Sequence, residues 1–247
     1  MSDRDPQARV VYDYPEDRLV GTVLATGETF ATDDPRRMAE WLFAAGARHG
    51  RVLMPDWREG DISPPKGDKI ALNYRLVQLG MDESARRKIE GIKPRSPWKT
   101  RYFVDTEFTS FENCQLISIG IVGEDGREFY AERTDFDQNA CSDFVKSSVL
   151  RKLGQFPGRA MPFAQLRTEL REWLEAIPTK PKPVLSYDYH GDYELVELAI
   201  GGSLPAGWSH ENVSGKLDAE RLAAFVAEHA GEHHALFDAR ANALAFR

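Results

Sequence analysis

Two acidic residues near the middle of the chain have the spacing of a metal site. Asp105 and Glu107 are separated by one residue in the run 101–108, RYFVDTEF. Side chains two positions apart on a β-strand project from the same face, so the two carboxylates would lie close together and a cation would relieve their repulsion. Oxygen ligands of this kind suit Mg²⁺ or Mn²⁺ better than zinc. The same pair could instead hold calcium or a structural ion without hydrolysis, and such pairs are also common on exposed strands.

A second group of candidate residues lies near the C-terminus, in the run 232–240, EHHALFDAR. We expect Asp238 near the start of a helix, where small neighbouring residues allow close packing. His233 precedes it by five residues and is therefore expected in the preceding loop, near the carboxylate but not beneath it. Because histidine titrates near neutrality, His233 is a candidate general base, although an isolated histidine is more often structural.

Together these motifs resemble the DEDDh superfamily of 3′–5′ exonucleases, and most closely its bacterial exoribonuclease branch, whose first motif reads Asp-Thr-Glu-Phe. The stretches that carry the resemblance are RYFVDTEF, LISIGIV, EDGREFY and HHALFDARANALA. His233, Ala235 and Asp238 match the third motif of the family, His-x-Ala-x-x-Asp. The resemblance covers roughly residues 100–247. It implies an α/β fold with a ribonuclease H-like mixed sheet flanked by helices.

The family also has a middle aspartate at the start of a helix, and the run 185–196, LSYDYHGDYELV, contains two candidates. Asp192 fits better, because apolar residues follow it at the third and fourth positions. Asp188 is the alternative. Tyr187 stands where the family usually has asparagine, which is a departure from the pattern.

The tandem histidines also need an assignment. His234 lies four residues before Asp238, where a sister group of the family has a tyrosine as the base. The match of Ala235 to the third motif instead favours His233, and His234 is then interpreted as a neighbouring packing or surface residue.

The resemblance implies a two-metal mechanism with two divalent cations, Mg²⁺ or Mn²⁺. The metal ligands and catalytic carboxylates would be Asp105, Glu107, Asp192 and Asp238. Asp105 would bridge both ions, and His233 would take the proton from the attacking water. The substrate would be the 3′ end of single-stranded RNA or DNA, released as nucleoside 5′-monophosphates. Thr106 and Phe108 are the candidate substrate contacts, with Phe108 stacking on the terminal nucleotide or, alternatively, forming part of the core.

The elements that must position these residues fall into two predicted domains. Residues 1–98 have no catalytic motif and are predicted to form a small α/β domain of unknown role. Residues 99–247 are the predicted exonuclease domain, with three antiparallel strands followed by helices and a further strand. Expected helices in this second part cover 141–153, 162–176, 192–200, 217–230 and 235–246. Helices are also expected over 70–79 and 83–89. The stretch 84–101 has seven basic residues against one glutamate. We interpret this stretch as a linker or irregular segment or, alternatively, as a contact for the phosphate backbone in which Trp98 could stack on a base.

Composition sets further bounds. The 247 residues carry a net charge of −7, and residues 1–98 hold 16 basic and 16 acidic residues, so the whole excess lies in the predicted catalytic part. A carboxylate metal site would produce this, and so would ordinary solvated helices. No apolar run approaches the length of a membrane span, and the polar N-terminus does not look like a signal peptide. Two cysteines without CxxC pairing suit a reducing, cytoplasmic location.

Three functions therefore remain open. The leading one is a metal-dependent 3′–5′ exoribonuclease. A single-stranded DNA 3′–5′ exonuclease, acting in repair or in defence against foreign DNA, is the alternative in the same class. The alternative in another class is a non-catalytic module that binds nucleic acid or a partner, and residues 1–98 are a candidate surface for a homodimer or a partner protein.

Overall fold

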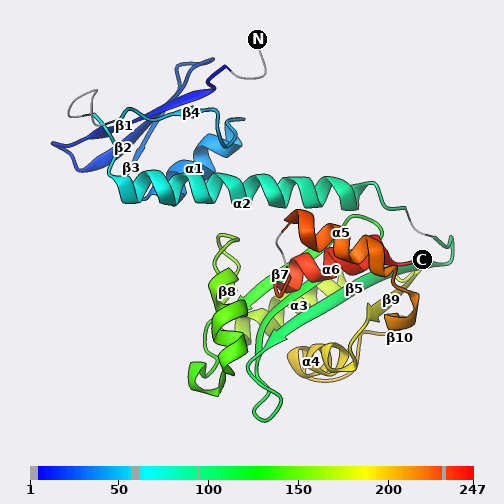
Figure 1. The fold of residues 1–247 in the computed structure, drawn as a ribbon. Helices are drawn as coiled ribbons and strands as arrows, with labels where there is room; N and C mark the ends of the chain where they lie inside the picture. Colours follow the sequence, from blue (N-terminus) through cyan, green and yellow to red (C-terminus); the bar gives the residue numbers. More distant parts are fainter. Residues whose placement is uncertain (1–4, 57–61, 94, 230–231) are drawn as a thin grey trace. The chain divides into compact units, whose positions relative to one another are not determined.

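A computed structural model describes most of the chain and divides it into two compact units (Figure 1). The described residues are 5–56, 62–93, 95–229 and 232–247. Unit 1 comprises Met1–Ser84 and unit 2 comprises Ala85–Arg247. The boundary between the units therefore precedes the predicted one after residue 98.

The long helix α2, Lys66–Glu90, accounts for this difference. It covers the helices predicted over 70–79 and 83–89, and its last turn lies in the basic stretch that we interpret as a linker. Ala85 and Ile89 lie four residues apart on one helix face, and both are buried among unit 2 side chains. Burial of this face favours helix over the irregular structure that the basic composition suggests. Two of the basic residues form ion pairs within unit 2, Arg86 with Glu128 and Lys88 with Glu228.

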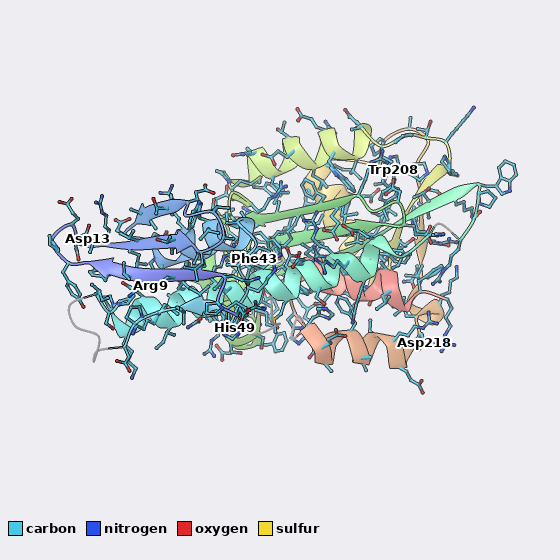
Figure 2. All side chains as sticks on the ribbon, turned by 90° about the horizontal axis from the view of Figure 1, so that it is seen from above. Arg9, Asp13, Phe43, His49, Trp208 and Asp218 are labelled. Carbon is cyan, nitrogen blue, oxygen red and sulfur yellow. The ribbon has the colours of Figure 1, made fainter. Side chains whose placement is uncertain are left out.

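Unit 1 has the predicted α/β character. Its four-stranded sheet has the order β3-β2-β1-β4, and the strands and the first helix are β1 Ala8–Asp13, β2 Arg18–Val23, β3 Thr29–Thr32, β4 Val52–Leu53 and α1 Pro35–Ala44. Burial alternates along β1, where Ala8 and Val10 are buried and Arg9, which is labelled in Figure 2, is exposed. The helix α1 starts as expected, because the Asp34 carboxylate accepts a hydrogen bond from the Arg36 amide and proline occupies the first turn.

Unit 2 is built on a six-stranded mixed sheet with the order β10-β9-β5-β6-β7-β8. Its strands are β5 Lys99–Phe108, β6 Leu116–Gly123, β7 Glu128–Arg133, β8 Ala160–Met161, β9 Lys182–Tyr187 and β10 Ser209–Asn212. The first three form the predicted antiparallel meander, whereas β9 runs parallel to β5 and β10 runs parallel to β9. This order and these directions are those of a ribonuclease H-like sheet, so the predicted fold class is confirmed.

Helices cover both faces of this sheet (Figure 1). They are α3 Phe163–Glu175, α4 His190–Ile200, α5 Ala219–His229 and α6 Ala235–Ala245. The apolar sides of α3 and α4 pack with Val104 on one face, and α6 packs with Phe103 on the other. Alternation along β5 therefore decides which helix each of its side chains meets. At the start of α5, the carboxylate of Asp218, a residue labelled in Figure 2, accepts hydrogen bonds from the backbone amides of Glu220 and Arg221.

The buried pair Arg240–Glu128 fastens α6 to the sheet. The Arg240 side chain is fully buried, and its guanidinium donates two hydrogen bonds of 2.8 Å to the Glu128 carboxylate on β7. A buried charge is stable only when it is paired in this way, so the pair also specifies where α6 lies.

The segment 141–153 differs from the single helix that the sequence predicts. It contains a π-helical turn, η3 Val145–Val149, and a 3-10 turn, η4 Leu150–Lys152. The other short turns are η2 Gln138–Ala140 and η5 Ser214–Lys216. Two serines and two β-branched residues within η3 disfavour a regular α-helix, because serine side chains compete for backbone groups and β-branched side chains lose rotamer freedom.

Candidate active site

Strand β5 extends beyond the end of its parallel neighbour β9, and two of the predicted carboxylates lie on this extension. The pairing of β9 with β5 stops at Ser186, opposite Phe103, whereas β5 continues through Asp105 and Glu107. The chain that leaves β9 then provides Asp188 and the first turn of α4. Parallel strands finish at the same edge of a sheet, and for this reason loops after neighbouring strands meet there.

A close approach at Gly120 brings α6 to the same place. Gly120 on β6 pairs with Asp105 on β5. A Cβ atom at Gly120 would lie 2.4 Å from the Ala235 carbonyl oxygen and 2.5 Å from the Leu236 Cα atom. Only glycine therefore lets the first turn of α6, which contains Asp238, lie against the strand beside Asp105. Nothing in the local sequence distinguishes Gly120 from other strand glycines.

The structure brings all four predicted carboxylates together and adds a fifth. Asp105, Glu107 and Asp238 can each offer one oxygen such that these oxygens lie within 4.8 Å of one another. Asp105, Asp188 and Asp192 form a second group by the same measure. Asp105 is common to both groups, which is the position expected of a carboxylate that bridges two cations.

The two candidates for the middle aspartate differ in how they are held. Asp192 is buried in the first turn of α4, and its Oδ1 atom accepts hydrogen bonds from the Thr106 hydroxyl at 2.6 Å and the Thr106 amide at 3.2 Å. Asp188 is partly exposed and accepts a hydrogen bond of 3.1 Å from the buried Asn242 side chain of α6. Thr106 is itself buried and orients Asp192, and the substrate contact that the sequence predicts for it stays a prediction. No motif in the sequence marks Asn242, which lies 54 positions from Asp188.

Burial and mutual repulsion raise the pKa values of the four predicted carboxylates. Burial, followed by the charges of Asp238 and Asp192, raises the pKa of Glu107 to about 8 and raises the pKa of Asp105 well above its ordinary range. The pKa of Asp192 rises to about 7 through burial, against the opposing hydrogen bonds from Thr106. Burial likewise raises the pKa of Asp238 to about 7, although backbone amides at the start of α6 oppose it.

Such crowding of acids fits a divalent metal ion. Without a cation, these groups can be ionised together only at high cost, because each carboxylate disfavours charge on the others. A divalent cation would reverse this effect, since it stabilises the ionised form of every ligand. The cluster is therefore suited to bind divalent metal.

The adjacent histidines occupy different environments. The His233 side chain is 39% exposed, and its backbone has a positive φ of 63°. The ring contacts the Phe144 ring edge-on, with 4.8 Å between centroids. His234 is buried at the start of α6, its ring stacks on Tyr130 with 4.9 Å between centroids, and burial lowers its pKa to about 3.

This difference makes His233 the candidate base and His234 a packing residue. Among the described residues, neither ring nitrogen of His234 has a hydrogen-bond partner. Its backbone amide donates to the Asp238 carboxylate at 3.1 Å, so it acts on the cluster through the main chain. His233 alone of the pair presents an accessible imidazole, consistent with the register that Ala235 predicts.

An aromatic hollow of about 600 Å³ lies beside Glu107. Phe108, Phe111 and Phe144 line it, and Phe111 is 81% exposed. The Phe108 ring meets the Phe111 ring edge-on at 5.2 Å and is only partly buried. Phe108 therefore lies at the rim of the core and also in the wall of a hollow large enough for a nucleobase.

We expect the metal-free protein to lose stability as pH rises. The raised pKa values mean that the folded state binds protons more tightly than the unfolded chain, so this stabilisation is complete below about pH 4 and is lost as pH rises through about 7 and 8. Each pKa unit is worth about 1.4 kcal/mol, and about 1 kcal/mol shifts Tm by roughly 2–4 °C in a chain of this size.

The measurement is a set of melting curves in EDTA between pH 5.5 and 8.5, compared with curves in Mg²⁺ or Mn²⁺. Tm in EDTA should fall by at least about 5 °C across this range, and the metal ions should largely restore it. In Asp105→Asn, where one charge of the cluster is absent, the fall in EDTA should be smaller. A Tm in EDTA that stays level or rises with pH would contradict the expected linkage.

Comparison with known proteins supports the resemblance seen in the motifs. The chain is similar to two curated proteins named 3′–5′ exoribonuclease, from Mycobacterium tuberculosis strains CDC 1551 and H37Rv. Each is 45% identical over 103 residues, which is 40% of this chain and 58% of the relative. The chain thus spans 58% of the length of the curated relatives that it matches, and the predicted similarity to 3′–5′ exoribonucleases is confirmed.

A solved structure of exonuclease I from Methylocaldum szegediense aligns with a TM-score of 0.40 and 14% identity, covering 58% of this chain and 38% of that one. No protein-family model matches the chain. Within the described residues, no helix is both long enough and apolar enough to cross a membrane.

Proposed function

We propose that this protein is a metal-dependent 3′–5′ exonuclease that releases nucleoside 5′-monophosphates, with single-stranded RNA as its substrate. The observation that carries the proposal is the largely buried carboxylate cluster together with His233, which has an accessible imidazole and a backbone amide that interacts with the Asp238 carboxylate. The names of the two mycobacterial relatives favour exonuclease activity and RNA. A DNA 3′ end remains the alternative substrate.

The metal ligands in this proposal are the four carboxylates that the sequence identifies. They are Asp105, Glu107, Asp192 and Asp238. We assign the middle position to Asp192, because it is buried and fixed by Thr106, and we place Asp188 as an additional acid beside it. When bound, a pair of Mg²⁺ or Mn²⁺ ions would lower the pKa of a water and stabilise the leaving 3′ oxygen.

The remaining roles belong to groups that face solvent. His233 would accept the proton of the attacking water, because its imidazole is accessible and histidine titrates near neutrality. Phe108 would stack on the terminal base from the wall of the aromatic hollow. A cytoplasmic location, and a homodimer or partner contact through residues 1–98, stay predictions.

The test is a digestion of 5′-labelled single-stranded RNA and DNA of the same sequence, with Mg²⁺, Mn²⁺ or EDTA. We expect a ladder that shortens from the 3′ end only when metal is present, with faster shortening of RNA. Faster shortening of DNA would select the alternative substrate. Binding of either strand without shortening under any metal condition would instead favour the non-catalytic module and would overturn the proposal.

A further inference from the structure

Residues 134–159, which connect β7 to β8, lie beside the start of α6, and we refer to this segment as the wall. The Glu132 carboxylate on β7 accepts hydrogen bonds of 2.9 Å at both oxygens from the Gly154 amide. Two residues further on, the Phe156 ring packs against Tyr130 and His234, with centroids 5.0 Å and 5.5 Å apart. These contacts fix the C-terminal half of the wall against the same helix that carries Asp238.

Lys152 extends from this wall to the loop that carries the candidate base. It is partly buried at the end of η4, and its ammonium donates a hydrogen bond to the backbone carbonyl of Glu232. Glu232 directly precedes His233. Phe144, from the N-terminal half of the same wall, contacts the His233 ring. The wall therefore holds the loop at two points, one on the backbone and one on the imidazole.

The loop needs such restraints because its backbone is strained. His233 has a φ of 63°, which lies in the left-handed region that side chains with a Cβ atom rarely adopt. A residue held there costs on the order of 1–3 kcal/mol and persists only when its surroundings fix it. Without the Lys152 bond, the carbonyl before His233 loses its tether, and the imidazole loses its fixed direction.

Lys152 also lies close to the carboxylates, which places its charge at the site. The Lys152 ammonium lowers the pKa values of Glu107 and Asp238, although the opposing effect of burial is larger for both. This proximity offers Lys152 a second possible task, contact with a substrate phosphate. The bond to Glu232 favours the first task, because the ammonium is already engaged with the loop backbone.

We propose that Lys152 is a positioning residue, which holds the Glu232–His233 backbone next to Asp238 and so limits where the His233 imidazole can lie. The proposal rests on the exonuclease function proposed above. It adds a residue whose effect on the reaction would act through His233 rather than through the substrate.

The first test is a double-mutant cycle on single-stranded RNA with Lys152→Gln, His233→Ala and the combined variant. Because a misplaced catalytic group costs up to about 100-fold in rate, we expect Lys152→Gln to lower kcat by about 10–100-fold with KM within about twofold of wild type. Lys152→Arg, which can still donate to the carbonyl, should recover most of the rate. In the His233→Ala background, Lys152→Gln should change kcat by less than about twofold, since coupled residues are not additive.

Lys146→Gln is the matched control, because it removes a surface lysine of the same wall. The Lys146 ammonium nitrogen lies 4.0 Å from an Asp143 carboxylate oxygen. This substitution should leave kcat and KM unchanged. If Lys152→Gln instead raises KM, flattens the salt dependence of KM and acts equally in the His233→Ala background, Lys152 contacts substrate and the positioning role is wrong.

Hydrogen exchange of the metal-free protein tests the same proposal without activity. Lys152→Gln should exchange the amides of His233 and His234 at least about tenfold faster than wild type, while Lys146→Gln should not. Unchanged exchange at these amides would overturn the positioning role. A wild-type chain that digests no substrate, with this exchange difference intact, would instead indicate that the proposed exonuclease function is wrong and the contact is structural.

Discussion

Asp105→Asn should lower kcat for 3′-end digestion by about 10³-fold or more. Asp105 is the carboxylate shared by both ligand groups, so its loss would weaken both metal positions at once. Metal ions contribute several kcal/mol of transition-state stabilisation, and each 1.4 kcal/mol corresponds to a factor of ten in rate. The measurement is single-turnover digestion of labelled RNA across a range of Mn²⁺ concentrations.

The same substitution should stabilise the metal-free protein at pH 8. Asp105 is crowded by Asp238, Asp192 and Glu107, and an amide in its place removes one of these repelling charges. Tm in EDTA should therefore rise in Asp105→Asn, although activity falls. Opposite changes in stability and activity are typical of a functional site and not of a folding defect. The control is Asp143→Asn, whose side chain is fully exposed, and which should alter neither quantity. Digestion by Asp105→Asn at the wild-type rate would show that the assigned site is wrong.

His233→Ala should lower kcat by about 10²–10³-fold and leave Tm close to that of wild type. Removal of a general base has an effect of this order, and the half-exposed ring contributes little to packing. His234 should behave in the opposite way. His234→Ala should lower Tm, because it removes a buried ring that stacks on Tyr130. His234→Phe should keep most of the activity, because the ring nitrogens have no partner among the described residues and the backbone amide still reaches Asp238.

These variants are compared by kcat and by melting temperature on the same preparations. The register of the third motif is wrong if His234→Phe is inactive while His233→Ala retains the wild-type rate. A metal titration followed by Tm separates a lost base from a lost ligand. His233→Ala should still be stabilised by Mn²⁺, whereas Asp105→Asn should not.

The parts of the site that could be predicted from sequence are those that local geometry dictates. The alternation of a strand places Asp105 and Glu107 on one face, and the start of a helix places Asp238 with His233 before it. The order of strands and helices in residues 99–247 follows from the same periodicities, and it gives the observed class of sheet.

The parts that could not be predicted depend on contacts between distant segments. Gly120 looks like any strand glycine until the first turn of α6 lies against it. Asn242 and Lys152 become relevant only through partners 54 and 80 positions away. The basic composition of 84–101 suggests a linker, but the helix expected over 83–89 is the structure observed, because Ala85 and Ile89 are buried. Short edge strands such as β10 have no alternating apolar pattern, so only their pairing reveals them.

The helix α2 determines how the catalytic part of this chain can be isolated. Its last turns supply Ala85 and Ile89 to the core of unit 2, although most of the helix is assigned to unit 1. A truncated protein that begins at residue 99, where the motifs suggest a domain start, would leave the apolar sides of Phe103, Phe225 and Phe237 without these neighbours. Expression fragments of the nuclease should therefore start within α2 and before Ala85, with a solubilising cap for the helix in place of the rest of unit 1.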